Sequence, residues 1–134
     1  NSIQYYEQCK KEAGDNVTFI EHVSQEELAA LYKVAKAHAL ISWMETPGLS
    51  TLEAAVMNCN VLVTDRGDTE YYFQNMAVYC EPGDVASIRT GVINVMEKEF
   101  NDELKNRVVT NFTWEHTAQQ TLEGYKLAIQ LHQE

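Results

Sequence analysis

Positive charge is scarce in this sequence. Its 134 residues include 10 lysines and arginines against 20 aspartates and glutamates, and the formal net charge is −10. Nucleic acids and anionic lipid surfaces are bound through basic patches, so we expect no nucleic acid and no lipid surface as the main partner. Binding of a small anionic ligand is still compatible with this composition, because backbone amides at a helix start can hold phosphate without basic side chains.

Long apolar runs are also missing. No stretch approaches the roughly 18 consecutive apolar residues that would indicate a membrane span. Residues 1–11 lack the basic and then apolar layout of a secretion signal. We therefore expect a cytoplasmic protein with no membrane span.

Cysteine and histidine show none of the spacings that bind metal. The three cysteines, Cys9, Cys59 and Cys80, are odd in number and form no CxxC pair. Cys59 and Cys80 adjoin apolar runs, which favours buried, reduced thiols. The four histidines are scattered without metal-ligand spacing, so we expect no bound metal.

Apolar runs typical of strands alternate with helical patterns along the chain. The expected strands are residues 17–20, 39–43, 61–64 and 77–80, and the expected helices with their caps are residues 2–13, 24–35, 49–57, 84–96, 101–109 and 113–129. Ser24, Asp84 and Thr113 are the expected cap residues. The alternation predicts an α/β fold, a Rossmann-like parallel sheet with helices on both faces, as one domain over residues 1–134.

Two burial patterns accompany this prediction. The compact apolar run at residues 39–43 is typical of a strand buried on both faces. In the last helix, Ala118, Leu122, Tyr125 and Ile129 recur at helical spacing and are expected to point inward.

The most informative segment follows the run at 39–43 and reads Glu45-Thr-Pro-Gly-Leu-Ser-Thr-Leu-Glu53. Ligands of parallel α/β sheets bind beyond the carboxyl ends of strands, where loops lead into helices. The unpaired amides of about residues 49–52 carry the positive end of the helix dipole and could hold a diphosphate, with Gly48 allowing close backbone approach. One carboxylate could then bind a ribose diol and the other the hydroxyls of a sugar beyond the phosphates.

The same spacing has a structural explanation. Ser50-Thr-Leu-Glu53 is itself a capping box in the first turn of the helix, in which Glu53 would only satisfy its own helix. Glu45 could be a solvated loop acid. From the spacing alone the structural explanation is favoured, because a Ser or Thr followed three residues later by Glu is common at helix starts.

The order of motifs resembles the C-terminal lobe of family 4 (group 1) glycosyltransferases, which have the two-Rossmann GT-B fold. That family shows an apolar strand, then E-G-F-G-L-P-x-L-E-A-x-A-x-G-x-P-V-V, and residues 45–63 match this stretch. Residues 17–19, 27–32, 81–84 and 112–114 look like the family's V-x-F, E-L-x-x-L-Y, D-P-G-D and F-x-W. The resemblance covers nearly all of residues 16–128.

The resemblance implies retaining transfer of a sugar from a nucleotide-diphosphate sugar to a saccharide or lipid-linked glycan, with no cofactor and no metal. Glu45 would be the catalytic residue and would contact donor-sugar hydroxyls, and Glu53 would contact the ribose. The backbone amides around Gly48, Leu49 and Ser50 would face the diphosphate.

The loop after Phe19 would lie near the base, which makes His22 and Val23 the expected base-proximal residues. The sequence also departs from the family pattern. Thr46-Pro47 replaces Gly-Phe, Ser50 replaces Pro, Asp68 replaces the second Gly of a turn, and Asn58 replaces a helix-ending Gly. The last change is tolerable because Asn accepts left-handed backbone angles. These departures indicate a subfamily variant and leave the donor sugar open.

We expect the chain to supply donor binding alone. A GT-B enzyme has two lobes, so the N-terminal acceptor lobe and the first strand–helix unit are expected to be missing, and the isolated chain to be inactive. The full-length enzyme could lie against the inner face of the membrane. The alternatives are a non-catalytic nucleotide-sugar-binding or interaction module and a sugar-nucleotide epimerase with the same fold.

Overall fold

The computed structural model describes residues 2–132 and contains a three-stranded parallel sheet in the order β1-β2-β3. The strands are β1 (Ala37–Leu40), β2 (Asn60–Thr64) and β3 (Val78–Cys80). In the register, Ala37 lies opposite Asn60 and Leu62 lies opposite Val78. Each parallel pair is joined by a helical crossover, as the alternation of patterns predicts.

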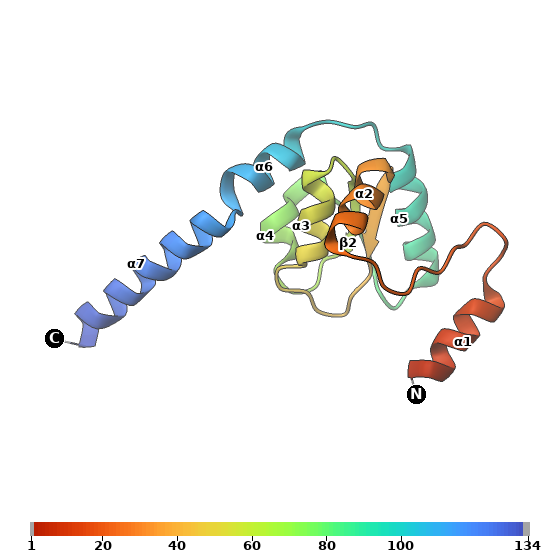
Figure 1. Ribbon diagram of the computed structural model, residues 1–134, viewed down its shortest axis with the longest axis horizontal. Helices are drawn as coiled ribbons and strands as arrows, with labels where there is room; N and C mark the ends of the chain where they lie inside the picture. Colours follow the sequence, from red (N-terminus) through yellow and green to blue (C-terminus); the bar gives the residue numbers. More distant parts are fainter. Residues whose placement is uncertain (1, 133–134) are drawn as a thin grey trace.

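Helices cover both faces of this sheet (Figure 1). On one face, α5 (Val85–Glu97) packs Val95 against Leu62 and Cys80. On the other face lie α3 (Leu49–Val56), α4 (Thr69–Phe73) and α6 (Glu103–Asn111), whose apolar side chains pack on Val61 and Val63. Successive side chains of a strand point to opposite faces, which is why Leu62 and its two neighbours enter different clusters. The predicted Rossmann-like α/β architecture is confirmed.

The helix α2 (Gln25–Val34) packs beside α3 through a small core of Tyr32, Ala54 and Cys59. It begins at the predicted capping box. The Ser24 hydroxyl accepts a hydrogen bond from the Glu27 amide at 3.2 Å, and the Ser24 amide donates to the Glu27 carboxylate at 2.8 Å. This arrangement satisfies two amides that a helix start otherwise leaves unpaired.

Other local predictions are also confirmed. The Asp84 carboxylate caps α5 by accepting from the Ala86 amide at 2.8 Å. The Thr113 hydroxyl accepts from the His116 amide at 3.3 Å, at the start of α7 (Trp114–His132). Asn58 has a φ of 67°, the left-handed conformation expected where the family has glycine.

Burial separates the central strand from its neighbours. All five residues of β2 are buried, whereas β1 lies at an edge of the sheet and is partly exposed. The prediction of a strand over residues 39–43 buried on both faces is therefore wrong in extent and in burial. The strand ends at Leu40, and Trp43 is 70% exposed in the loop beyond it. An apolar run does not reveal which strand will have a neighbour on both sides.

The last helix does not bury its apolar face. Helices α1 (Ser2–Glu12) and α7 extend away from the central body (Figure 1), and neither has a buried residue. Leu122, Tyr125 and Ile129 are 53%, 66% and 60% exposed, so their expected inward orientation is wrong. Their spacing describes a helix face correctly, but the described chain brings no surface against that face.

Residues 17–20 form no strand, contrary to prediction. A strand needs a neighbour for its backbone amides and carbonyls, and the described residues place none beside this segment. The segment contacts α1 instead, through an edge-on contact between the rings of Phe19 and Tyr6 at 5.7 Å. None of the helices within residues 2–132 combines the length and the apolar character needed to cross a membrane.

Candidate functional site

The loop between β1 and α3 holds Glu45 at the carboxyl edge of the sheet. The Ser42 hydroxyl donates to the Glu45 carboxylate at 3.1 Å. The Glu45 carbonyl accepts from the Asp68 amide at 3.0 Å, and Glu45 forms an isolated parallel bridge with Gly67. Glu45 is thus tied both to its own loop and to the loop after β2, which fixes its backbone.

Two glycines make this position possible. Gly67 has a φ of 76°, and a β-carbon there would lie 2.3 Å from the Glu45 carbonyl oxygen. Gly48 has a φ of 68°, and a β-carbon there would lie 3.1 Å from the Glu45 γ-carbon. Glycine alone adopts such angles without a steric penalty. The two loops can therefore close around Glu45 only because both positions lack a side chain.

Gly48 is also the N-cap of α3, and it offers no side chain to cap the helix. The amides of Thr51 and Leu52 donate to the Gly48 carbonyl at 2.9 and 3.1 Å. Within residues 2–132, the amides of Leu49 and Ser50 have no acceptor. The predicted donor set at residues 49–52 is thus corrected to two amides, which follow directly on Gly48, the residue that packs against the Glu45 side chain.

Glu53 is not a capping residue. Because α3 begins at Leu49, Glu53 is its fifth residue and lies beyond the first turn, which contains no acidic residue. Gly48 rather than Ser50 is the N-cap, so the capping-box explanation of Glu53 and its placement in the first turn are wrong. The exposed Glu53 carboxylate forms no hydrogen bond or ion pair with the described part of the chain. Capping of its own helix therefore does not explain the glutamate at position 53.

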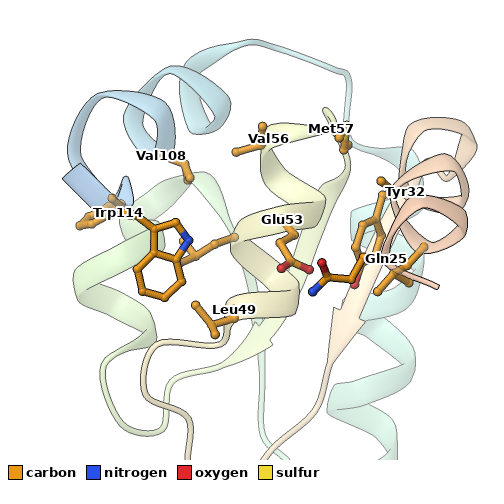
Figure 2. A pocket seen from close by; sticks show the side chains of 12 residues that line it. Gln25, Tyr32, Leu49, Glu53, Val56, Met57, Val108 and Trp114 are labelled. Carbon is orange, nitrogen blue, oxygen red and sulfur yellow. The ribbon is translucent and has the colours of Figure 1, made fainter. Parts of the chain in front are cut away.

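A cavity of about 350 Å³ opens beside Glu53, between α2, α3 and the start of α7. Figure 2 shows the polar ends of Glu53 and Gln25 pointing toward each other, with Tyr32 next to them and Leu49 and Trp114 on the opposite side. The rest of its lining is apolar: Leu28, Ala29, Leu52, Val56, Met57, Val108 and Phe112. An apolar cavity with a few convergent polar groups is typical of a small-molecule site.

The structure does not bring all the predicted residues into this cavity. Glu53 and Leu49 line it, whereas Glu45 does not. His22 is exposed and Val23 half-buried in the irregular segment before α2, and neither lines the cavity. The residue of that region that does reach it is Gln25.

Gln25 and Tyr32 are cavity residues that the sequence did not single out. The sequence pattern predicts Tyr32 to be a core residue of an amphipathic helix and Gln25 to be part of a capping segment. A signal for both exists, since Gln25 begins the helix whose inner face carries Tyr32 and Leu28. Recognising it requires knowing that this face meets Glu53.

His38 lies under the start of α3. Its Nε2 is 3.2 Å from the Thr51 hydroxyl, and its ring meets the Tyr32 ring edge-on at 5.6 Å. Burial lowers the pKa of His38 below its ordinary value of 6.5, because a buried charge loses its hydration. His38 is therefore neutral at pH 7 and acts as a packing and hydrogen-bonding residue.

Arg66 follows β2 and directly precedes Gly67, which forms the bridge with Glu45. Its guanidinium contacts the Glu81 carboxylate at 2.6 Å and the Asp65 carboxylate at 3.6 Å. Two carboxylates thus already balance its charge. No group of three or more His, Cys, Asp and Glu side chains within residues 2–132 is arranged to hold a metal ion.

The fold places the chain in a known structural class. Sucrose-phosphate synthase from Thermosynechococcus elongatus has the same fold, with a TM-score of 0.77 at 20% sequence identity over 96% of this chain and 34% of that chain. The described chain therefore has the Rossmann-like α/β architecture of GT-B glycosyltransferases. Residues 4–113 match the family described as glycosyl transferases group 1, and the chain belongs to that family.

Two curated relatives carry related names. A D-inositol 3-phosphate glycosyltransferase of Rhodococcus erythropolis is 29% identical over 121 residues, covering 84% of this chain and 27% of the relative. The O-antigen chain mannosyltransferase RfbU of Salmonella typhimurium is 31% identical over 110 residues, covering 81% of this chain and 31% of the relative. The chain thus spans about a third or less of the length of these proteins.

Proposed function

We propose that this chain is the donor-binding, C-terminal lobe of a family 4-type retaining glycosyltransferase. Its ligand is a nucleotide-diphosphate sugar. The name of one relative, an O-antigen chain mannosyltransferase, supports a hexosyl group such as mannose as the transferred sugar and a saccharide or a lipid-linked glycan as the acceptor. The name of the other relative makes an inositol phosphate a further candidate acceptor. Acceptor binding belongs to a separate lobe of the full-length enzyme, which works at the cytoplasmic side.

The start of α3 carries this proposal. Two amides without an acceptor, those of Leu49 and Ser50, lie along the chain between Glu45 and Glu53. The amides and the positive end of the helix dipole suit a diphosphate. Glu45 then contacts hydroxyls of the transferred sugar on one side, and Glu53 contacts the ribose in the cavity on the other. The order along the chain, with the helix start between the two glutamates, suits a ligand with a sugar at each end of a diphosphate.

Charge sets a requirement on the rest of the enzyme. Glu45 and Glu53 repel a diphosphate, and the guanidinium of Arg66 is already paired with two carboxylates. We expect basic residues outside the described chain to complete the phosphate site. The mechanism needs no metal, because amides and basic side chains hold the diphosphate.

Neutralising each carboxylate tests the assignment, with Glu45→Gln and Glu53→Gln measured for donor binding and for transfer in the full-length enzyme. A hydrogen bond to a charged group contributes about 1.5–3 kcal/mol, so we expect each variant to lose roughly tenfold to a hundredfold in kcat/KM. Glu97→Gln, an exposed acid at the end of α5, is the matched control for the change in net charge and should keep full activity.

The direction in which donor affinity changes shows whether a carboxylate contacts the donor or only lies near it. If neither carboxylate touches the donor, removing a negative charge leaves the affinity for an anionic nucleotide sugar unchanged or improves it. Such a result with both variants, in folded protein, would sink the proposed roles.

A further inference from the structure

Two further hollows lie in the surface around α4, and Tyr71 lines both of them. The polar hollow has a volume of about 600 Å³ and is lined by Gly67, Asp68, Glu70, Tyr71, Gln74 and Asn75. The aromatic hollow, of about 380 Å³, is lined by Pro47 and Leu49 together with residues of α4, α6 and α7. Both volumes lie within the range of ligand sites. We refer to the two hollows together as the Tyr71 groove, because the Tyr71 side chain, which is 64% exposed, belongs to both.

Both parts of the Tyr71 groove adjoin the loops that hold Glu45. In the polar hollow, Gly67 forms the parallel bridge with Glu45, and the Asp68 amide donates to the Glu45 carbonyl at 3.0 Å. In the aromatic hollow, Pro47 follows Glu45 by two residues. A ligand in the groove therefore contacts the same two loops that position the proposed catalytic carboxylate.

The Asp68 carboxylate is not needed by the fold. Asp68 is the N-cap of α4, where an aspartate commonly accepts from a helix amide, but its side chain makes no such bond. Within residues 2–132 it forms no ion pair or other side-chain hydrogen bond. The family pattern has glycine at this position, so the turn itself does not require a carboxylate. Asp68 is free to bind a ligand in the polar hollow.

The aromatic rings of the Tyr71 groove are held in place by their neighbours. The ring of Tyr71 meets those of Tyr72 and Phe112 at 5.3 and 5.8 Å. The Arg107 guanidinium donates to the carbonyls of Tyr71 and Tyr72 at 2.7 and 2.8 Å, which fixes the backbone of α4 against α6. A ligand that stacks on Tyr71 therefore costs little side-chain freedom.

The chemistry of the lining selects a neutral polar ligand. Among the described residues, no lysine, arginine or histidine lines either hollow, so the groove does not suit a phosphate-bearing ligand. Carboxylates accept hydrogen bonds, and the carboxamides of Gln74, Asn75 and Gln120 both donate and accept. Exposed aromatic faces, those of Tyr71 and Trp114, offer an apolar surface. A pyranose ring has the complementary features, with hydroxyls around its edge and apolar C–H groups on its faces.

We propose that the Tyr71 groove binds a neutral oligosaccharide, as the part of the acceptor glycan that extends beyond the reacting sugar. One sugar stacks on Tyr71 with its hydroxyls toward Asp68, and the next sugar lies in the aromatic hollow near Trp114. The inference rests on the proposed glycosyltransferase function and goes beyond it. The separate lobe binds the reacting sugar, and the donor-binding lobe adds a second contact with the glycan.

The test titrates mannotriose, maltotriose and chitotriose calorimetrically into the chain, each beside its monosaccharide. We expect at least one trisaccharide to bind, about tenfold or more tightly than its monosaccharide, which fills only one hollow. Tyr71→Leu removes the aromatic face and should weaken this binding about threefold to tenfold. Tyr125→Leu, at an exposed tyrosine of α7, is the matched control and should bind like the wild type.

Asp68→Asn is the second variant, and it keeps the shape of the side chain. Hydrogen bonds to a charged acceptor are about twice as strong as neutral ones, so we expect a loss of affinity of about threefold to tenfold. Asp102→Asn is its matched control, because Asp102 is likewise an N-cap whose side chain makes no cap hydrogen bond. Urea midpoints equal to that of the wild type show that the variants are folded.

The outcomes distinguish this inference from the proposed function. If no trisaccharide binds at millimolar concentration, or if folded Tyr71→Leu and Asp68→Asn both bind like the wild type, the glycan groove is wrong and the donor-binding proposal is unaffected. Binding of spermidine in preference to every trisaccharide would also overturn the inference, because the carboxylates would then serve a cation. If Glu45→Gln and Glu53→Gln keep full transfer while trisaccharide binding depends on Tyr71 and Asp68, the donor-binding proposal falls and the saccharide groove remains.

Discussion

Replacing Gly67 by alanine should disrupt the backbone bridge between Gly67 and Glu45 and so destabilise the loop that contains Glu45. A β-carbon at this position would lie 2.3 Å from the Glu45 carbonyl oxygen and 3.1 Å from the Glu45 amide nitrogen. Both atoms belong to the backbone, so no side-chain rotation relieves the overlap. The bridge between the two segments, with its hydrogen bond from the Asp68 amide to the Glu45 carbonyl, must open or shift.

The expected loss of stability has two parts. Gly67 has a φ of 76°, and an alanine in the left-handed region costs about 1–2 kcal/mol. Forcing a methyl group into a space already filled by backbone costs about 1–3 kcal/mol more. We therefore expect Gly67→Ala to lower the free energy of unfolding by roughly 2–5 kcal/mol, a large share of the stability of a small domain.

Urea denaturation followed by far-UV circular dichroism measures this loss. Gly48→Ala is the graded comparison, since its φ of 68° carries the same angular penalty but its new β-carbon meets side chains and no backbone, the nearest being that of Glu45 at 3.1 Å. Gly124→Ala is the control, because a β-carbon in that exposed part of α7 has nothing within 4 Å. We expect the losses in the order Gly67, Gly48, Gly124. A loss below about 1 kcal/mol for Gly67→Ala would refute the claim that this glycine is required by the bridge.

Two further predictions concern the rest of the fold. Asp84→Ala should lower stability by about 1 kcal/mol by leaving the Ala86 amide without its cap, whereas Asp84→Asn should retain most of it; equal losses in both would contradict the capping role. Folding lowers the pKa of His38, so on acidification the unfolded chain binds a proton at His38 near pH 6.5, whereas the folded chain binds it only at lower pH. Stability should fall as the pH drops below that value, and His38→Gln should flatten the curve of unfolding free energy between pH 7 and 5. Identical curves for wild type and variant would rule out His38 as the source.

The fold was predictable where local chemistry and apolar pattern agree. The central strand β2 and the caps at Ser24 and Asp84 follow from short-range rules that leave few alternatives. The family resemblance through residues 45–63 is confirmed as membership of the group 1 glycosyltransferases. These are features in which each residue depends mainly on its immediate neighbours.

The errors arise where the answer depends on a distant surface. Residues 17–20 have the composition of a strand but no neighbouring strand in the described chain. Leu122 and Ile129 have the spacing of a buried helix face, yet both are more than half exposed. A periodic pattern states which residues share a face, and only the tertiary structure states whether anything covers that face.

The structure changes the interpretation of the motif that contains Glu53. The Ser50-to-Glu53 spacing favours a capping box, and under that interpretation Glu53 has no need of a ligand. Because the chain turns at Gly48, α3 starts two residues earlier than the capping box requires, and the carboxylate moves past the first turn. A two-residue shift of this kind cannot be read from a pattern that is compatible with both starts. It leaves Glu53 in the lining of the cavity, so the capping explanation no longer applies to this carboxylate, and the donor contact proposed for it rests on that position.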